Sequence, residues 1–194
     1  MNPRIIGLIL VTSLALLGVG VYLFSSFGRN AGNYQWIECR SEHFSFDCLF
    51  QIEPNPGLSK AISNSLQSSA KIEVVASAYV ISQKGWDGIV AKIVYPEGSP
   101  IDLRQAIISG MQDILSQYKN NRELPEPIKI SVESLDEAQK VFTPLTKAEG
   151  VVPFYGFVAR KGTTLYMMFL INDEANLSQV GFDHMIHSFK AMTK

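Results

Sequence analysis

Two histidines near the end of the chain have the spacing of a metal site. His184 and His187 lie three positions apart in a segment with helical periodicity, so they share one face, and Asp183 precedes them. Imidazole and carboxylate groups are ligands of zinc. The alternative is a pair of ordinary surface histidines on a terminal helix. We favour this alternative and predict no metal.

The chain carries no enzyme motif built on serine or glycine. A serine hydrolase presents its nucleophile in a Gly-x-Ser-x-Gly turn, whereas Ser109 and Gly110 lie inside a predicted helix. A dinucleotide-binding loop needs three spaced glycines, and Gly18-Val19-Gly20 lacks the third. Walker-type, H-E-x-x-H and EF-hand motifs are also missing from the sequence. We therefore predict no catalytic residue, no cofactor and no enzymatic activity.

Cys39 and Cys48 are the only cysteines, and an oxidising compartment favours their pairing. They belong to the two arms of a predicted hairpin, residues 36–39 and 44–50. A disulfide here closes about ten residues and stabilises by about 2–3 kcal/mol on the chain-entropy model. The connecting residues 41–43 lack the Gly or Asn of favoured tight turns, which counts against pairing. Two buried free thiols are the alternative.

A tryptophan occupies the glycine-rich tip of another predicted hairpin, in Lys84-Gly85-Trp86-Asp87-Gly88. The indole either folds back onto the core or stays exposed for a partner or a membrane surface. In the second case Trp86, Lys84 and Asp87 form a candidate partner-binding site.

Two helices are predicted from apolar residues at helical spacing. Asp102 offers an N-cap side chain for a helix over residues 102–120, and Gly110 in its middle would allow close packing on a sheet. A second helix over residues 177–190 closes the chain. The side chains that this helix is predicted to turn toward the core are Val180, Met185 and Phe189.

Alternating and β-branched segments predict a set of strands joined mostly by hairpin-length connections. The Ser-rich residues 58–69 fit a weak edge strand better than a loop. The order of strands, helix, strands and helix predicts an α+β fold, with helices packed on a largely antiparallel sheet. The predicted strands cover residues 44–50, 72–81, 89–95, 128–133, 139–145, 151–159 and 164–171.

An uncharged apolar run from Ile5 to Phe24 indicates which cellular compartment the rest of the chain occupies. Twenty residues of helix span about 30 Å, which matches the hydrocarbon core of a bilayer. We therefore expect residues 5–24 to cross the lipid bilayer once. A signal peptide cleaved near Ser26-Phe27-Gly28 and a buried core helix are the alternatives. The short leading tail with Arg4 should stay in the cytoplasm, with the remainder outside it.

These features predict three parts of the chain. Residues 1–28 form a membrane anchor or uncleaved signal, residues 29–35 a linker, and residues 36–194 a single soluble α+β domain. All but one of the 17 basic residues and all 18 acidic residues follow the anchor, so this domain is close to neutral. Nucleic-acid binding needs a basic face, and no such partner is predicted.

The layout resembles the PsbP-like family, which includes the extrinsic photosystem II subunit and bacterial relatives such as DcrB-like envelope proteins. The resemblance covers most of residues 36–190. It is carried by the opening strand Phe44-Ser45-Phe46 and by an ending with a turn, a strand with Tyr166 and a helix closing in Ser188-Phe189. It implies an α/β/α sandwich that binds or assembles with partners, and no catalytic residue.

Together these observations predict a non-enzymatic, single-pass membrane protein. Its soluble domain should lie in the periplasm or outside the cell and serve as a binding or assembly module for membrane or envelope proteins. The alternative is a small apolar-ligand binding protein, because a sheet covered by helices can leave a cleft lined by Phe, Tyr and Met.

Overall fold

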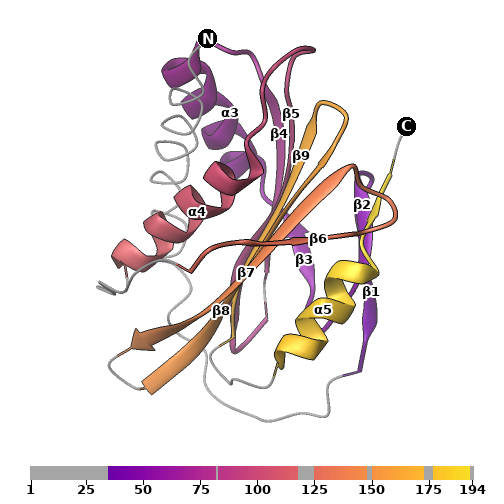
Figure 1. Ribbon diagram of the computed structural model, residues 1–194, viewed down its shortest axis with the longest axis vertical. Helices are drawn as coiled ribbons and strands as arrows, with labels where there is room; N and C mark the ends of the chain where they lie inside the picture. Colours follow the sequence, from indigo (N-terminus) through magenta and orange to yellow (C-terminus); the bar gives the residue numbers. More distant parts are fainter. Residues whose placement is uncertain (1–34, 82, 118–124, 148–149, 173–176, 193–194) are drawn as a thin grey trace.

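The computed structural model describes residues 35–81, 83–117, 125–147, 150–172 and 177–192. They form an α+β fold with two antiparallel sheets and three helices (Figure 1). The helices are α3 (Pro56–Ala70), α4 (Leu103–Gln117) and α5 (Gln179–His187). The strands are β1 (Ile37–Arg40), β2 (Phe44–Cys48), β3 (Ile52–Pro54), β4 (Val75–Ile81), β5 (Trp86–Val94), β6 (Ile128–Ile130), β7 (Glu137–Lys147), β8 (Gly150–Lys161), β9 (Thr164–Asn172) and β10 (Lys190–Ala191).

The larger sheet has seven strands in the order β3-β4-β5-β9-β8-β7-β6, and the smaller has three in the order β1-β2-β10. Strand β9 lies at the centre of the larger sheet, and all its residues except Thr164 are buried. A strand covered on both faces has to be apolar on both faces, which explains its uninterrupted apolar sequence. The predicted antiparallel sheet with helices on it is confirmed, and each predicted strand apart from residues 58–69 is present with shifted ends.

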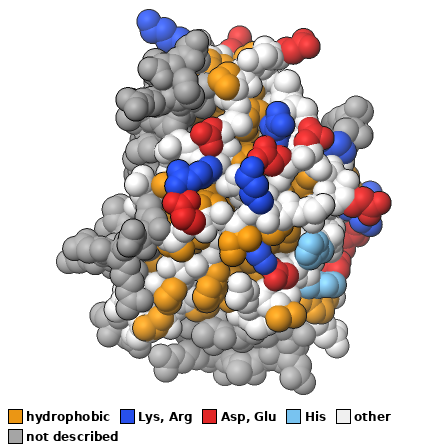
Figure 2. Space-filling view, in the orientation of Figure 1, with side chains coloured by type: hydrophobic (Ala, Val, Ile, Leu, Met, Phe, Trp, Pro, Cys, Tyr) orange, Lys and Arg blue, Asp and Glu red, His pale blue; other side chains and the backbone are white. Residues whose placement is uncertain are grey.

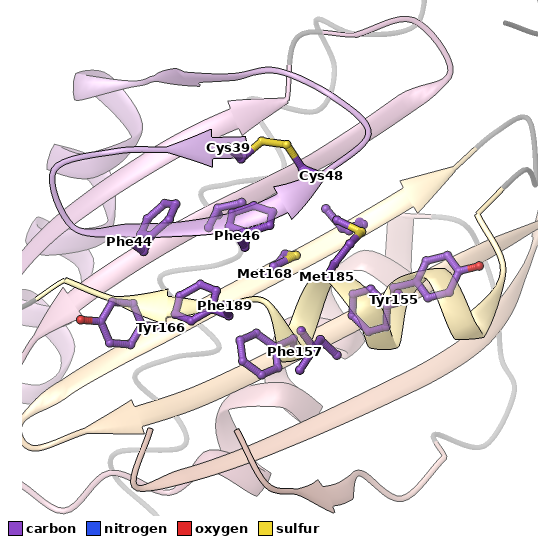
Figure 3. Packing of buried hydrophobic residues seen from close by; sticks show 14 of the residues in the cluster. Cys39, Phe44, Phe46, Cys48, Tyr155, Phe157, Tyr166, Met168, Met185 and Phe189 are labelled. Atoms are coloured by element: carbon purple, nitrogen blue, oxygen red, sulfur yellow. A yellow bond between two sulfur atoms is a disulfide. The ribbon is translucent and has the colours of Figure 1, made fainter. Parts of the chain in front are cut away.

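Two hydrophobic clusters cover the two faces of the larger sheet. On one face, α3 and α4 bring Leu66 and Met111 against Phe169 of β9 and its neighbours. On the other face, α5 and the small sheet enclose a second cluster that includes Phe44 and Phe189 (Figure 3). In Figure 1, α3 and α4 accordingly lie on one side of the sheet and α5 on the other.

Gly110 lets α4 approach the sheet closely. A Cβ atom built at this glycine would lie only 2.4 Å from Cζ of Phe169, the central aromatic residue of β9. Any side chain here would push the helix away from the ring. The predicted packing role of Gly110 is confirmed, and so is the predicted cap, because Oδ1 of Asp102 accepts a hydrogen bond from the Gln105 amide at 2.9 Å.

The prediction of an edge strand over residues 58–69 is wrong, because this segment is helix α3. Asn55 caps the helix by accepting a hydrogen bond from the Leu58 amide at 2.9 Å, and Pro56 follows at the first helical position. Ile62 and Leu66, four residues apart, turn inward and are buried. Of the serines between them, which favoured a strand, Ser63 accepts a hydrogen bond from the Ala76 amide of β4 and Ser65 is buried.

Helix α5 has a different inward face from the one predicted. Met185 and Phe189 are buried as expected, but Val180 is 78% exposed, so its predicted position in the core is wrong. The helix begins at Gln179 with Ser178 as its N-cap, which places Val180 in the first turn, facing outward. Phe182, Met185 and Ile186 form the buried face instead.

The apolar run Ile5–Phe24, the predicted anchor over residues 1–28 and most of the linker 29–35 lie outside the described residues. Within the described ranges, no helix has the length and apolar character needed to span a bilayer.

Candidate functional site

His184 contacts an acidic side chain and an aromatic ring rather than a second histidine. Its Nε2 lies 2.9 Å from Oδ2 of Asp47 on β2, and its ring lies 4.6 Å from that of Trp36, centroid to centroid. His187 is exposed one turn further along α5. Among the residues that the structure describes, no three His, Cys, Asp or Glu side chains gather into a group that could hold a metal ion. The contacts of His184 hold α5 against the first hairpin.

Cys39 and Cys48 form the predicted disulfide. They face each other across β1 and β2 with their Cα atoms 5.7 Å apart, and both are buried. Figure 3 shows the bond lying over the aromatic cluster that includes Phe44 and Phe46. The turn at residues 41–43 needs no glycine, because the Ser41 hydroxyl accepts hydrogen bonds from the amides of His43 and Phe44 at 3.0 and 3.1 Å.

Trp86 folds back onto the core, so the exposed alternative is wrong. Its side chain is 2% exposed, and its ring centroid lies 5.0 Å from that of Phe50. The indole N–H is buried and meets no acceptor among the described residues. Lys84 and Asp87 beside it remain partly exposed. The partner-binding role of these three residues stays a prediction, now without an accessible indole.

A pocket of about 340 Å³ lies where the end of β6 meets the start of β7 and the end of β8. The loop that joins β6 to β7 forms one wall, and its Leu135 amide donates to the Val132 carbonyl at 3.0 Å. We call this the Arg160 pocket. It is lined by Lys129, Ile130, Ser131, Val132, Leu135, Asp136, Glu137, Ala138 and Arg160.

The strand register determines which side chains meet in the Arg160 pocket and directly beside it. Glu137 pairs with Arg160 across β7 and β8, and Lys129 pairs with Gln139 across β6 and β7. Paired residues share a face, and so do residues two apart along a strand, so these four side chains lie together. They lie on the face of the sheet that α4 covers further along β7, where Val141 is buried.

Arg160 is the one cation of the pocket without a partner. Among the described residues, its buried Nε has no hydrogen-bond acceptor, and the ion pairs between described side chains do not include its guanidinium. The acids nearby are engaged: Asp136 accepts a hydrogen bond from the Gly162 amide at 2.7 Å, and Glu137 lies 3.8 Å from Nζ of Lys129. An unsatisfied buried donor costs about 1–3 kcal/mol, and more for a charged group.

Gln139 adds a second unsatisfied polar atom beside the pocket. Its side chain is 5% exposed, and its buried Oε1 has no hydrogen-bond donor among the described residues. The pocket is therefore polar and charged, and it does not supply the aromatic cleft that an apolar ligand requires. The hypothesis of a small apolar-ligand binding protein stays a prediction.

Sequence reasoning did not find the Arg160 pocket. Lys129 and Arg160 are thirty-one positions apart and come together only through the pairing of β6, β7 and β8. The sequence signal was limited to an arginine at the end of a predicted strand, just before a turn, which is a common surface position.

Compared with known proteins, the chain matches no protein-family model and no curated protein sequence. Its function therefore has to be argued from its own surfaces.

Proposed function

We propose that this chain is a non-enzymatic, membrane-tethered module whose folded part lies outside the cytoplasm and binds a membrane or envelope protein. The observation that carries the proposal is an uncovered apolar surface on the β7–β8 hairpin. Residues 5–24 supply the tether in this scheme, with the folded domain in the periplasm or outside the cell.

The hairpin surface follows from the register of its two strands. Phe142 on β7 pairs with Tyr155 on β8, and Thr146 pairs with Val151, so Phe142 and Val151 share the face on which α5 packs. Helix α5 covers Tyr155 through Phe182, with the ring centroids 4.9 Å apart. Among the described residues, Phe142 and Val151 on the rest of this face remain exposed.

Large apolar side chains occupy the exposed part of the face. Phe142 is 40% exposed and Val151 59% exposed, and Val180 at the start of α5 is exposed on the same side of the sheet. Figure 2 shows apolar side chains gathered on this face, over β7, β8 and α5. Aromatic and apolar residues on a rigid, exposed hairpin are the composition of the central part of protein interfaces. A partner with a complementary apolar patch fits this surface.

The disulfide supports the proposed compartment. Structural disulfides persist in oxidising compartments and are rare in the cytosol. Cys39 and Cys48 are paired and buried in the core of the described domain. An apolar run of membrane-spanning length that precedes a disulfide-bonded domain is consistent with a tether that holds the domain outside the cytoplasm.

The fold also supports the proposed relation to the PsbP-like family. The Phe44-Ser45-Phe46 motif begins β2, and the central strand β9 is followed by helix α5 and Ser188-Phe189. Helices on both faces of an antiparallel sheet are consistent with the α/β/α sandwich that the resemblance implies. Members of this family are expected to bind or assemble with partners, in agreement with the proposal.

Site-specific photo-cross-linking in intact cells tests the partner surface. A photoreactive amino acid is placed at Phe142 or Val151, and at Val75 as the matched control, which is an exposed valine on β4 near the opposite edge of the sheet. We expect one membrane or envelope protein to be cross-linked from positions 142 and 151 and not from 75. Equal adducts at all three positions, or none at any, would contradict the proposal.

Membrane fractionation with added protease tests the tether and its orientation. We expect the full chain in the membrane fraction. A domain in the periplasm should be digested only after the outer membrane is opened. A domain at the cell surface should be digested on intact cells. Recovery of the intact chain from the cytosol, with both cysteines open to alkylation, would refute the proposed location.

A further inference from the structure

We propose that this chain pairs with a second copy of itself through strand β1, with the two β1 strands antiparallel and a two-fold axis at Cys39. This inference goes beyond the proposed function, because it depends neither on the tether nor on the apolar surface of the β7–β8 hairpin. It rests on the open edge of the small sheet, on the direction of the β1 backbone groups and on the charges of two exposed side chains.

Strand β1 forms an open edge of the small sheet. The order of that sheet is β1-β2-β10, so among the described strands only β2 pairs with β1. In Figure 1, β1 lies at the side of the molecule away from α3 and α4. The outer amides and carbonyls of such an edge form a ready template for pairing with a strand of another chain.

The hydrogen bonds of the first hairpin determine which backbone groups of β1 face outward. The Ser41 amide donates to the Phe44 carbonyl at 2.9 Å, so these two residues form a hydrogen-bonded pair. Such pairs alternate along an antiparallel ladder, which makes Cys39 and Phe46 the next one. The backbone groups of the residues on either side of Cys39, at positions 38 and 40, therefore point away from β2 and toward the open edge.

These two positions carry opposite charges that have no partner within the described chain. Glu38 and Arg40 are both exposed, and they share one face of β1 because they are two residues apart. The ion pairs between described side chains include neither of them. Glu38 lies opposite Asp47 of β2, another acid, whose carboxylate contacts His184 instead, and Arg40 lies opposite the uncharged Ser45. A cation brought beside Glu38 and an anion beside Arg40 are both favourable.

The charges select one register for the pairing of two copies. A two-fold axis at this edge places Glu38 opposite Glu38, Arg40 opposite Arg40, or Glu38 opposite Arg40. The first two registers bring like charges together at the centre of the contact, whereas the third forms two ion pairs and has its axis at Cys39. In this third register Trp36, which is 43% exposed, lies diagonally opposite Arg40 of the second copy, within reach of a cation–π contact.

A second copy fits this edge better than an unrelated strand does. Charged side chains on an edge strand resist pairing in general, because an unrelated strand leaves them unmatched. The order of Glu38 and Arg40 is complementary to its own reverse, so a second copy satisfies both charges at once. A two-fold contact of this kind also closes on itself and does not extend into a fibre. Because two short strands bury little surface, we expect a reversible dimer.

Sedimentation equilibrium of the full chain in detergent micelles, with micelles in excess over protein, tests the dimer. We expect the unsubstituted chain to show a monomer–dimer equilibrium in the micromolar range. Glu38→Arg and Arg40→Glu should each raise the Kd of the dimer at least about tenfold, because each turns two attractive pairs into two repulsive ones. Lys60→Glu is the matched control: it makes the same change in net charge as Arg40→Glu at an exposed position on α3, and it should leave the Kd unchanged.

Mixing the two reversed chains tests the register. A chain with Glu38→Arg and a chain with Arg40→Glu have opposite charges at both positions, so the mixed pair regains both ion pairs. Fluorescence energy transfer between the two labelled populations should report a heterodimer with a Kd close to that of the unsubstituted dimer. A mixture that associates no more tightly than the separate variants overturns the proposal, and so does a dimer that neither reversal weakens.

Hydrogen exchange of the unsubstituted chain decides the question even if a reversed chain fails to fold. Exchange at the Glu38 and Arg40 amides should slow as the protein concentration is raised through the dimer range, because the second copy supplies acceptors for them. Exchange at these two amides that is independent of concentration, or a chain that stays monomeric, contradicts pairing through β1.

Discussion

Tyr155 is a buried phenol that ties the start of the last helix to the sheet. It is 1% exposed, and its O–H donates to the carbonyl of Leu177, just before α5. Burial raises the pKa of Tyr155 to about 12. An ordinary tyrosine has a pKa of about 10, so folding favours the neutral phenol.

This shift predicts a loss of stability in alkali. Because the pKa of Tyr155 is raised on folding, its contribution is fully present below pH 10 and is lost as the pH rises from 10 toward 12. Over that window the free energy of unfolding should fall about 1.4 kcal/mol per pH unit more steeply in the unsubstituted chain than in Tyr155→Phe. Urea unfolding at pH 8, 10 and 11 measures the two slopes.

The control for Tyr155→Phe is a substitution in the same cluster that removes no titrating group. Phe157→Leu should lower stability by a constant amount at all three pH values. Parallel pH dependence for the unsubstituted chain and Tyr155→Phe would show that the phenol does not resist ionisation in the fold. At pH 8, Tyr155→Phe itself should cost about 1 kcal/mol through the lost hydrogen bond to Leu177.

At the scale of elements, α3 completes the edge of the larger sheet. Strand β3 pairs with Tyr79–Ile81 of β4, and no other strand in the described part of the chain pairs with the first half of β4 on that side. Two serine hydroxyls of α3 take its place: Ser59 accepts from the Ala78 amide at 2.8 Å, and Ser63 accepts from the Ala76 amide at 3.0 Å. The helix therefore protects an edge that would otherwise expose free amides.

Removing these hydroxyls should destabilise the fold although alanine is the better helix former. Ser59→Ala and Ser63→Ala each leave a strand amide without an acceptor, at a cost of about 1–3 kcal/mol. The gain in helix propensity is only about 0.5 kcal/mol. Urea unfolding measures the balance, and hydrogen exchange at the Ala76 and Ala78 amides should speed up.

Ser68→Ala, on the exposed side of the helix, is the matched control and should be neutral or slightly stabilising. Equal stabilisation by all three substitutions would refute this role for α3.

The same helix shows where sequence reasoning succeeded and where it could not. Alternating residues predicted the strands well, because the apolar residues of one strand face are only two positions apart in the sequence. The segment that forms helix α3 was predicted to be a strand because that prediction relied on its high serine content. The cap at Asn55, Pro56 after it and the four-residue spacing from Ile62 to Leu66 were a readable helix signal. The partners of the Ser59 and Ser63 hydroxyls were not readable, since they lie on a separate strand.

The candidate site was harder to predict than the fold. The pairing of Cys39 and Cys48 was predictable because both lie in one local hairpin. Whether Trp86 points inward depends on Phe50, which lies in the connection between β2 and β3. The unpaired state of Arg160 depends on three strands and on the engagement of two carboxylates elsewhere. Local patterns do not record such long-range pairings.

On the scale of the whole molecule, the last residues of the described chain join its two sheets. Strand β10 pairs with β2 of the small sheet, and the Met192 amide donates to the His43 carbonyl at 2.9 Å. The Ser134 hydroxyl, from the loop of the larger sheet that follows β6, donates to the Phe189 carbonyl at 2.9 Å. The beginning and the end of the described domain are therefore held together.

Phe189 is the centre of this junction. Its ring packs against Phe44 and Phe46 of the small sheet, with centroids 5.8 and 6.0 Å away. It also packs against Phe157 and Tyr166 of the larger sheet at 5.5 and 5.4 Å (Figure 3). Since no other ring joins as many partners among the described contacts, the attachment of the small sheet should depend on this side chain.

Phe189→Ala should therefore loosen the first hairpin before the rest of the domain. Removing a buried ring of this size costs about 3–5 kcal/mol, which is a large part of the stability of a domain. Hydrogen exchange should show β1, β2 and α5 losing protection first, while β5, β8 and β9 keep theirs because their other face is still covered by α3 and α4. The matched control is Val180→Ala, whose side chain is 78% exposed and should be nearly neutral. If protection fell evenly across both sheets, the small sheet would be an integral part of one cooperative core and not a layer fastened through Phe189.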